Sequence, residues 1–401
     1  MMGIHSMKFN VSIPLLPLNH QVGGHTSMLV YDSDTVCKPL VSQEHRFYET
    51  LPREMRSFTP QYKGIVLVSP RRDSQGHLNL IANPSPNGCS TTFDTSVAVW
   101  HQVKLKMNVA AEVEQHAMKQ SHFKAAVIER CSKSSYKAEN WFHSALSCQI
   151  DSPGHSPDKQ ACNPWGLYCH QQHLSRMSSE CHQNKLYKYL LLENVTSKYV
   201  LPCILDLKMG TRQHGDDASE EKKARHMEKC ALSTSASLGV RLCGMQVYQA
   251  DSGQFLWKDK YYGRMLSTEG FHQALYRYLH NGHFLRSDLL DPIIPQLMSL
   301  KSVIECQGSY RFYSSSILIV YEGEDAANNY YLQNIGISST CQGGRHSKVD
   351  VRMIDFAHTT FTDSRNSLTD NDGPDKGYIF GIENLLKIFC DIRDNKQQKC
   401  K

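Results

Sequence analysis

Residues 202–210 read PCILDLKMG, an apolar run that carries Asp206 and Lys208 and ends in a glycine. The density of apolar side chains predicts a buried strand. Side chains alternate across a strand, so Asp206 and Lys208 leave the same face and can meet one ligand. Gly210 then allows a sharp turn. An isolated Asp-x-Lys pair is usually an edge-strand salt bridge, so the segments around it decide its meaning.

The segment that follows is predicted to form a helix over residues 218–232, with Ser219 as its N-cap and glutamates in its first turn. Lys222, His226 and Lys229 fall at i, i+4 and i+7 and therefore share one face. The pattern favours a pocket for a polyphosphorylated ligand, and a solvated helix with surface ion pairs is the alternative. Further donors nearby are Lys223 and Arg225 on the helix and Arg212 and His214 in the preceding loop.

Three more segments bear on the candidate site. Residues 28–40 contain two short apolar runs around an Asp-Ser-Asp turn, which predicts a hairpin with Lys38 on its second strand. A helix is predicted over residues 42–51, with Ser42 as its N-cap. Residues 349–356 predict an apolar strand with Asp355 at its C-terminal end, a position suited to holding Mg2+ against nucleotide phosphates. A turn or cap is the default role of an isolated Asp-Phe pair, so Asp355 counts only in combination with Lys38 and the paired site.

The chain has 401 residues, enough for two to three domains of ~150 residues or for one large two-lobed unit. The predicted fold class is α+β, with a small N-terminal lobe built on a sheet and a larger mixed lobe. The expected divisions are the N-terminal lobe at 1–82, a variable, partly disordered insertion at 83–160, the end of the first lobe at 161–195, and the C-terminal lobe at 196–401. Other predicted elements are strands at 63–69, 186–195, 200–207 and 315–322, the first bounded by Pro60 and Pro70, a hairpin at 240–263, and helices at 268–281, 291–306 and 377–391.

Composition excludes several classes of protein. A net charge of +5, from 44 Lys and Arg against 39 Asp and Glu, is too small to imply nucleic-acid binding by itself. No apolar run approaches the ~18 residues of a membrane helix, and the first residues lack the apolar core of a secretion signal. A soluble protein of the cytoplasm and/or nucleus is therefore expected. The 14 cysteines are spread along the chain, which favours reduced thiols. No phosphate-binding motif of the P-loop or Gly-x-Gly-x-x-Gly type is present, which excludes a P-loop enzyme.

Three other patterns receive a structural interpretation. Phe312, Tyr313 and Tyr321 are expected in the core, because no RNP-type pattern that would indicate RNA stacking accompanies them. An acidic run invites a calcium loop, but the glutamate expected at its twelfth position is missing, so a solvated turn is favoured; its members are Asp370, Asp372 and Asp375. A group of cysteines and histidines invites a zinc site, but its spacing fits no standard finger; its members are Cys162, Cys169, His170, His173, Cys181 and His182.

These segments together resemble the inositol polyphosphate kinase family. The mark of that family, Pro-x-x-x-Asp-x-Lys-x-Gly, is matched by Pro202, Asp206, Lys208 and Gly210. The extension TRQHGDDASEEKKARH at 211–226 is similar to the inositol hexakisphosphate kinase branch. RFYSSSILIVYEG at 311–323 resembles a further family block, with Ile317 where the first Leu is usual. Residues near 83–160 have no match. Other similar blocks are HQVGGHTSMLVYDSDTVCKPL (20–40), EHRFYETLP (44–52), FTPQYKG (58–64), NPWGLYCHQQHLSRM (163–177), IDFAHTT (354–360) and DKGYIFGIENL (375–385).

The resemblance implies a fold related to protein kinases, with ATP between the lobes and the inositol phosphate on the larger lobe. By motif position, Lys38 would hold the ATP phosphates and pair with Glu44, with Glu49 as the alternative. Asp206 would lie beside the ribose or the reacting group, Lys208 would bridge nucleotide and substrate, and Asp355 would bind Mg2+. His358 would assist near the reaction centre, and the adenine hinge would be the backbone of Glu193, Asn194 and Val195. The implied substrate-binding set is Pro202, Lys208, Gly210, Arg212, Lys222, Lys223, His226 and Lys229.

The implied activity is transfer of the γ-phosphoryl group of ATP to inositol hexakisphosphate, which makes an inositol pyrophosphate. The acceptor is then a phosphate whose second pKa is ~6, so a strong base is less needed than cations that offset repulsion between two polyanions. The alternatives are multikinase-like phosphorylation of hydroxyls on related inositol polyphosphates, and a non-catalytic protein that binds inositol polyphosphates. Retention of Lys38, Asp206, Lys208 and Asp355 favours a kinase. Neither direct nucleic-acid binding nor membrane insertion is expected.

Overall fold

The computed structural model describes residues 12–83, 163–178, 185–323, 348–361 and 373–399, all within one compact unit. The predicted insertion at 83–160 lies outside these residues except for Asn83, as do Cys162, Cys181, His182, Asp370 and Asp372. Within the described part of the chain, no helix is both long and apolar enough to span a membrane. The fold is mixed α+β with antiparallel sheets, as predicted.

Six antiparallel strands close into a barrel in the order β1-β2-β3-β6-β4-β5. The predicted hairpin is present as β2 and β3, and β3 places Lys38 opposite Leu190 of β6. One prediction is wrong in detail: the strand expected at 63–69 continues through Pro70 as β4. Two further strands, β1 and β5, which no pattern indicated, complete the barrel. The bounds are Ile13–Pro17 (β1), Leu29–Asp32 (β2), Thr35–Pro39 (β3), Tyr62–Arg72 (β4), Leu78–Asn83 (β5) and Tyr187–Glu193 (β6).

A second, five-stranded antiparallel sheet has the order β12-β11-β7-β8-β9, so the motif strand β7 lies at its centre. Alternation along β7 sends Leu205 and Leu207 into the main core, whereas Ile204 packs in a separate cluster with Val22 and Val320. Asp206 and Lys208 share the second face with Ile204. The bounds are Pro202–Met209 (β7), Val240–Gln249 (β8), Gln254–Lys258 (β9), Ser316–Glu322 (β11) and Val349–Ile354 (β12), and a small ladder joins Tyr310–Arg311 (β10) to Thr360–Phe361 (β13).

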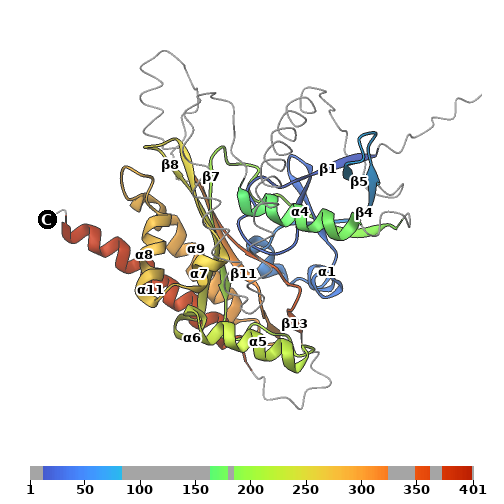
Figure 1. Ribbon diagram of the computed structural model, residues 1–401. Coiled ribbons are helices and arrows are strands. Elements are labelled where there is room, and N and C mark those ends of the chain that lie inside the picture. Colours follow the sequence, from blue (N-terminus) through green and yellow to red (C-terminus); the bar gives the residue numbers. More distant parts are fainter. Residues whose placement is uncertain (1–11, 84–162, 179–184, 324–347, 362–372, 400–401) are drawn as a thin grey trace, which may run out of the picture. The chain divides into compact units, whose positions relative to one another are not determined.

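Helices α8, α9 and α11 contact the sheet and bury its apolar face (Figure 1). The predicted residues Phe312 and Tyr321 are in this core, about 1% exposed, and Tyr313 is also buried. The bounds are Ser42–Glu49 (α1), Pro164–Ser178 (α4), Glu220–Ala231 (α5), Thr234–Leu238 (α6), Lys260–Arg264 (α7), Thr268–Tyr278 (α8), Leu290–Glu305 (α9) and Lys376–Lys399 (α11), with 3-10 turns at Arg53–Phe58 and Ser287–Leu289.

The helix ends test the capping predictions. Ser219 is the N-cap of α5, and its hydroxyl accepts a hydrogen bond from the Lys222 amide, as predicted. Ser42 is not an N-cap: it is the first residue of α1, and Val41 precedes it without a side-chain cap. The predicted hairpin at 240–263 ends at Lys258, after which Asp259 caps the short helix α7. The chain therefore turns and carries Lys260 and Arg264 along β8 instead of continuing outward.

Candidate active site

Lys38 is the point at which the barrel and the sheet meet. Its Nζ lies 2.7 Å from Oε1 of Glu44 on α1 and 2.6 Å from Oδ1 of Asp355, the residue after β12. Glu44 is completely buried and also accepts a hydrogen bond from the Phe356 amide at 3.1 Å. Glu49 points elsewhere: its carboxylate is 55% exposed and lies 3.5 Å from His45. Burial opposes the charged form of Lys38, but Asp355 and Glu44 outweigh it and raise the lysine's pKa.

Asp355 adopts an unusual backbone conformation, with φ of 65° in the left-handed region. A non-glycine residue there is uncommon and is held by its surroundings. Burial opposes ionisation of its carboxyl group, but Lys38 and then Lys208 lower its pKa, so the group carries a negative charge. The side chain is 30% exposed, and its second oxygen has no hydrogen-bond partner among the described residues. One oxygen is therefore available to a cation.

Asp206 is 3% exposed, and its Oδ1 has no hydrogen-bond partner among the described residues. Burial, followed by the nearby charge of Asp355, raises its pKa to about 6. Two strands away from β12, Lys208 lies on the same face, where its Nζ donates to the carbonyl oxygen and the hydroxyl of Ser314 at 2.8 and 2.9 Å. Neither contact neutralises the lysine. Asp206 and Lys208, the pair in the sequence motif, thus lie with Lys38 and Asp355 in one group of charged side chains.

A group of basic side chains lies beside these residues, here called the basic cluster: Lys208, Lys222, His226, Lys229, Arg241, Lys260 and Arg264. Their mutual influence shows that they are neighbours. Burial and then Arg264 lower the pKa of both Lys229 and Lys260, the latter to about 8. Burial, then Lys229 and Lys222, lower the pKa of His226 to about 4, with a backbone hydrogen bond opposing. Within the part of the chain that the structure describes, no carboxylate forms an ion pair with Lys229, Arg241, Lys260 or Arg264.

His358 belongs to the same region. Its Nδ1 is buried without a hydrogen-bond partner among the described residues. Burial and then Lys222 lower its pKa, with Asp217 opposing, so the ring is neutral near pH 7. A neutral imidazole can donate one hydrogen bond to an anion without adding charge.

The predicted hinge follows β6. Glu193 accepts a hydrogen bond from the Gln61 amide at 3.0 Å, and the Asn194 amide donates to the Asp34 carbonyl at 2.8 Å. Val195 packs against the apolar cluster that contains Val22 and Ile204. The amide of Val195 donates no hydrogen bond to another described residue, so it can serve an external acceptor.

Four predicted residues are not brought into this group by the contacts that the structure shows. Pro202 lies at the opposite end of β7 from Lys208, and its carbonyl accepts a hydrogen bond from Gln246. Gly210 makes the turn after β7 with φ of 88°. Arg212 pairs with Asp216 and stacks on Tyr313, 4.2 Å from the ring centroid, and Lys223 pairs with Glu220 on its own helix. Gly210 and Arg212 instead line a cavity of about 220 Å3 with Arg311, Lys376 and Asp375.

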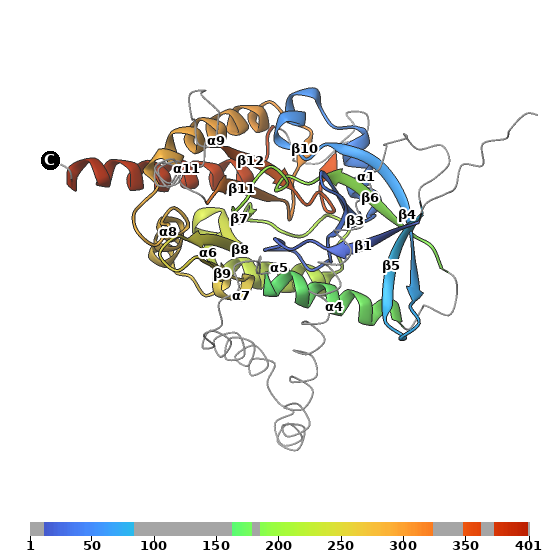
Figure 2. The same cartoon turned by 90° about the horizontal axis from the view of Figure 1, so that it is seen from above.

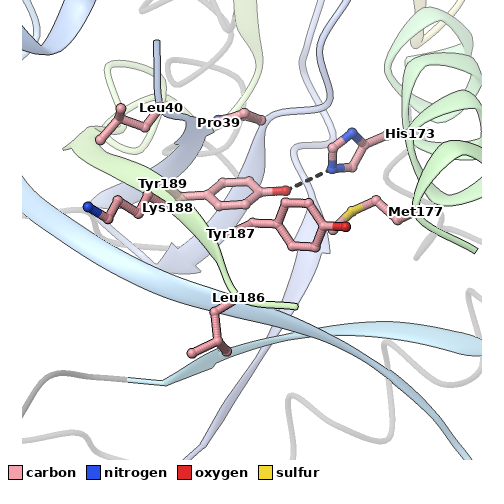
Figure 3. Close-up of a pocket in the computed structure, with 8 residues that line it drawn as sticks. All are labelled: Pro39, Leu40, His173, Met177, Leu186, Tyr187, Lys188 and Tyr189. Carbon is pink, nitrogen blue, oxygen red and sulfur yellow. Dashed lines mark hydrogen bonds between the residues drawn. The ribbon is translucent and has the colours of Figure 1, made fainter. Parts of the chain in front are cut away.

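A second cavity of about 300 Å3 lies between α4 and the barrel and contains none of the predicted site residues (Figure 3). His173 of α4 reaches Tyr189 at 2.8 Å, and Met177 lies beside Tyr187. His170 likewise contacts a hydroxyl, that of Ser27, at 3.0 Å, and Cys169 is a buried free thiol. These three residues of the cysteine and histidine group therefore make packing and hydrogen-bond contacts, and no group of three or more His, Cys, Asp or Glu residues placed to hold a metal ion occurs among the described residues.

Comparison with known proteins decides the family. The model for inositol polyphosphate kinase matches residues 189–390. Inositol hexakisphosphate kinase 3 of Mus musculus is 52% identical over 394 residues, which cover 97% of this chain and 98% of that protein. Inositol hexakisphosphate kinase 1 of Homo sapiens is 48% identical, with 96% and 94% covered. The chain belongs to the inositol polyphosphate kinase family.

The family match begins in β6 and ends in α11, so it contains Asp206, Lys208 and Asp355 but not Lys38. The near full-length identity to the two hexakisphosphate kinases extends the relationship over the barrel. Among solved structures, inositol phosphate multikinase Ipk2 from S. cerevisiae, in complex with ADP and Mn2+, is 28% identical. That alignment covers 51% of this chain and 84% of the other, with a TM-score of 0.41.

Sequence patterns within the family blocks did not reveal three members of this region. Lys260 falls within the predicted hairpin at 240–263 and Arg264 lies just after it, although the run KDKYYGR at 258–264 is visibly basic. His25 lies in the block at 20–40 and, in the fold, contacts Lys260 at 2.8 Å. A cap at Asp259 was the signal that could have separated α7 from the hairpin.

Proposed function

We propose that this chain is an inositol hexakisphosphate kinase, which transfers the γ-phosphoryl group of ATP to a phosphate of inositol hexakisphosphate. The observation that carries the proposal is the juxtaposition of two differently charged sets. Lys38, Asp206 and Asp355 form one set, and the basic cluster, with no carboxylate partner for several of its members among the described residues, forms the other. The identity of 52% to a hexakisphosphate kinase over 97% of the chain supports the choice of substrate.

The nucleotide would lie between the barrel and the sheet, in a fold related to that of protein kinases. Lys38 would contact its phosphates while Glu44 fixes the lysine, as the strand lysine and its helix glutamate do in protein kinases. The Val195 amide would donate to the adenine ring. The apolar cluster of Val22, Ile204 and Leu318, with Val195 and Ile354 packed against it, would contact the faces of the base.

A divalent cation fits the carboxylates at this site. Asp355 has one oxygen without a partner among the described residues, and Asp206 carries a buried oxygen that is likewise unpartnered there. Oxygen donors of this kind suit Mg2+. Asp355 would hold the ion, with Asp206 as a second candidate ligand, and the bound ion would neutralise charge on the transferring phosphoryl group. The depressed pKa of Asp355 keeps it ionised and ready for that role.

The acceptor chemistry follows from the remaining side chains. An oxygen of an inositol-bound phosphate attacks the γ-phosphorus, a new phosphoanhydride bond forms, and the bond to the β-phosphate oxygen breaks to release ADP. Asp206, with its pKa raised to about 6, can take the proton of an acceptor that still carries one. Lys208 would bridge the two reactants, and Lys222, Lys229 and the rest of the basic cluster would offset the repulsion between them.

The test uses the full-length protein with ATP, Mg2+ and inositol hexakisphosphate, and anion-exchange chromatography to detect a product more acidic than the substrate. We expect such a product from the unaltered chain. Asp355→Ala should abolish turnover while calorimetry still detects binding of inositol hexakisphosphate, and Asp291→Ala, at an exposed position on α9, should change neither. Turnover of only less phosphorylated inositols would indicate a hydroxyl kinase, and binding without turnover by the unaltered chain would indicate an interaction protein.

A further inference from the structure

The segment that joins β1 to β2 passes directly over Asp206. At Gly23 an added Cβ would lie 1.8 Å from Oδ2 of Asp206, and at Gly244 of β8 it would lie 2.0 Å from the Val22 carbonyl oxygen. Asp206 and Gly244 are partners across the β7–β8 ladder. The backbone at residues 22–23 thus packs closely against the paired residues Asp206 and Gly244. This approach requires glycine both at position 23 of the segment and at position 244 of the sheet.

Hydrogen bonds fix the rest of this segment. The Gln21 amide group donates to the carbonyls of Gly23 at 3.0 Å and Thr26 at 2.8 Å, and its oxygen accepts from the Met28 amide. The indole of Trp165, on α4, donates to the Gly24 carbonyl at 3.2 Å. His25 therefore projects from a turn that is held by several hydrogen bonds, and its own side chain is only partly covered.

His25 meets Lys260, the first residue of α7. The Lys260 Nζ lies 2.8 Å from His25 Nδ1, and it also lies 4.8 Å from the Trp165 ring centroid and 5.0 Å from that of Tyr261. Figure 2 shows α4 and α7 near each other beside β9, consistent with the 6.2 Å between the Trp165 and Tyr261 rings. An ammonium group can only donate, so the imidazole must accept through an unprotonated nitrogen. Partial burial and then Lys260 lower the pKa of His25 to about 4, which keeps that nitrogen unprotonated near pH 7.

The partners of Lys260 among the described residues share one property: none is an anion. Two aromatic faces and a neutral imidazole hold the ammonium group in place without cancelling its charge. A carboxylate in the place of His25 would fix the lysine equally well but would compete with a phosphate for it. A lysine held only by solvent would lose more side-chain entropy on meeting its ligand.

We propose that His25 is a positioning residue, which accepts a hydrogen bond from Lys260 and thereby holds that ammonium group in place for a phosphate of the inositol substrate. The identity of that substrate rests on the proposed function. His25 itself has no contact with the reacting atoms in this proposal. The expected consequence of losing His25 is weaker substrate capture with an intact chemical step.

The test is a set of four variants of the full-length protein, measured in steady-state kinetics at saturating Mg-ATP and pH 7. His25→Ala should raise KM for inositol hexakisphosphate about tenfold, the size of one hydrogen bond to a charged group, and leave kcat within about twofold. His25→Asn places an oxygen near the position of Nδ1 and should restore KM. Lys260→Gln should raise KM, and adding His25→Ala to it should produce no further rise, because both changes remove the same interaction.

Two measurements distinguish a positioning role for His25 from a general loss of structure. His77→Ala, on an exposed hairpin of the barrel, is the matched control and should behave as the unaltered chain. Calorimetric binding of inositol hexakisphosphate without ATP should repeat the non-additive pattern, so the role of His25 can be tested even if the chain does not turn this substrate over. Additive effects of the two changes, failure of His25→Asn to restore KM, or a loss confined to kcat would each overturn the positioning role.

Discussion

Replacing Asp206 by Asn tests the electrostatics of the site through the stability of the protein. The carboxyl group of Asp206 is buried with one oxygen unpartnered among the described residues, and its pKa in the folded chain is about 6 rather than 3.8. Because the folded value is the higher one, the folded state favours the protonated form. The raised pKa of Asp206 therefore stabilises the folded protein fully at pH values below the unfolded pKa, and this stabilisation is lost as the pH rises through about 6. The difference between the folded and the unfolded pKa corresponds to about 3 kcal/mol of folding free energy, lost between full protonation and full ionisation of the carboxyl group.

Asn resembles the protonated carboxyl group in shape and lacks the charge, so Asp206→Asn should escape this loss. We expect the free energy of unfolding of the variant, relative to that of the unaltered chain, to increase by about 1.4 kcal/mol between pH 5 and pH 8, because roughly half of the window lies in that range. Turnover should disappear in the same variant. The carboxylate that lies at the reacting groups would thus lower the stability of the folded protein at neutral pH.

The assay is guanidinium denaturation of both proteins at pH 5 and pH 8, without ATP and with a chelator present. Ligands are omitted because they bind the folded state and would mask the difference. Asp251→Asn, an exposed position in the β8–β9 turn, is the control and should show no dependence on pH relative to the unaltered chain. Equal pH dependence of Asp206→Asn and the unaltered chain would refute the raised pKa and with it the proposed use of Asp206 as a proton acceptor.

Three further outcomes are expected. The pKa of Lys260 is lowered to about 8, so KM for inositol hexakisphosphate should rise several-fold as the pH passes through about 8, and Lys260→Arg, which stays charged, should flatten that rise. Glu44→Gln should reduce kcat/KM for ATP by about tenfold or more, because Glu44 contacts Lys38. Glu49→Gln should leave kcat/KM unchanged, because Glu49 contacts His45 instead. The opposite result in nucleotide titrations would contradict the assignment of Glu44 as the partner of Lys38. Gly23→Ala should destabilise the protein by about 1–3 kcal/mol and suppress turnover, because its Cβ would collide with Asp206. Gly308→Ala, whose added Cβ would make only ordinary contacts at 3.9–4.0 Å, should retain turnover, and equal turnover in the two variants would show that the segment at Gly23 moves to accommodate the Cβ.

Local patterns predicted the elements that carry the motif, because their signals lie within a few residues. The apolar run at β7, the Asp-Ser-Asp turn before Lys38 and the cap at Ser219 each specify a structure from adjacent side chains. The run that became α7 misled the prediction, because its residues alternate as in a strand. Its helical form depends on Asp259, which caps it, and on Gly263, where a Cβ would lie 2.0 Å from the Leu242 carbonyl oxygen of β8.

Tertiary contacts determine those residue pairings at the site that sequence patterns could not predict. His25 and Lys260 are 235 positions apart and meet only because the β1–β2 segment folds onto β8. The sequence left Glu49 as an alternative to Glu44, because both follow Lys38 on the same predicted helix. The orientation of that helix, which buries Glu44 and exposes Glu49, decides for Glu44. Conversely, the motif position of Pro202 suggested a substrate contact, but the strand places it at the far end from Lys208.

The two carboxylates on Lys38 differ in a way that bears on the order of events at the site. Asp355 uses one oxygen for Lys38 and keeps another open, and it is partly exposed, whereas Glu44 is wholly buried and tied to the Phe356 amide. If Asp355 holds a divalent ion and Lys38 holds phosphate, their direct contact must weaken when nucleotide binds, and Glu44 alone must then keep the lysine in place. Asp355 is therefore the exchangeable partner and Glu44 the permanent one. Loss of Glu44 should lower the folding stability of the protein even without ligands, whereas loss of Asp355 should chiefly reduce turnover.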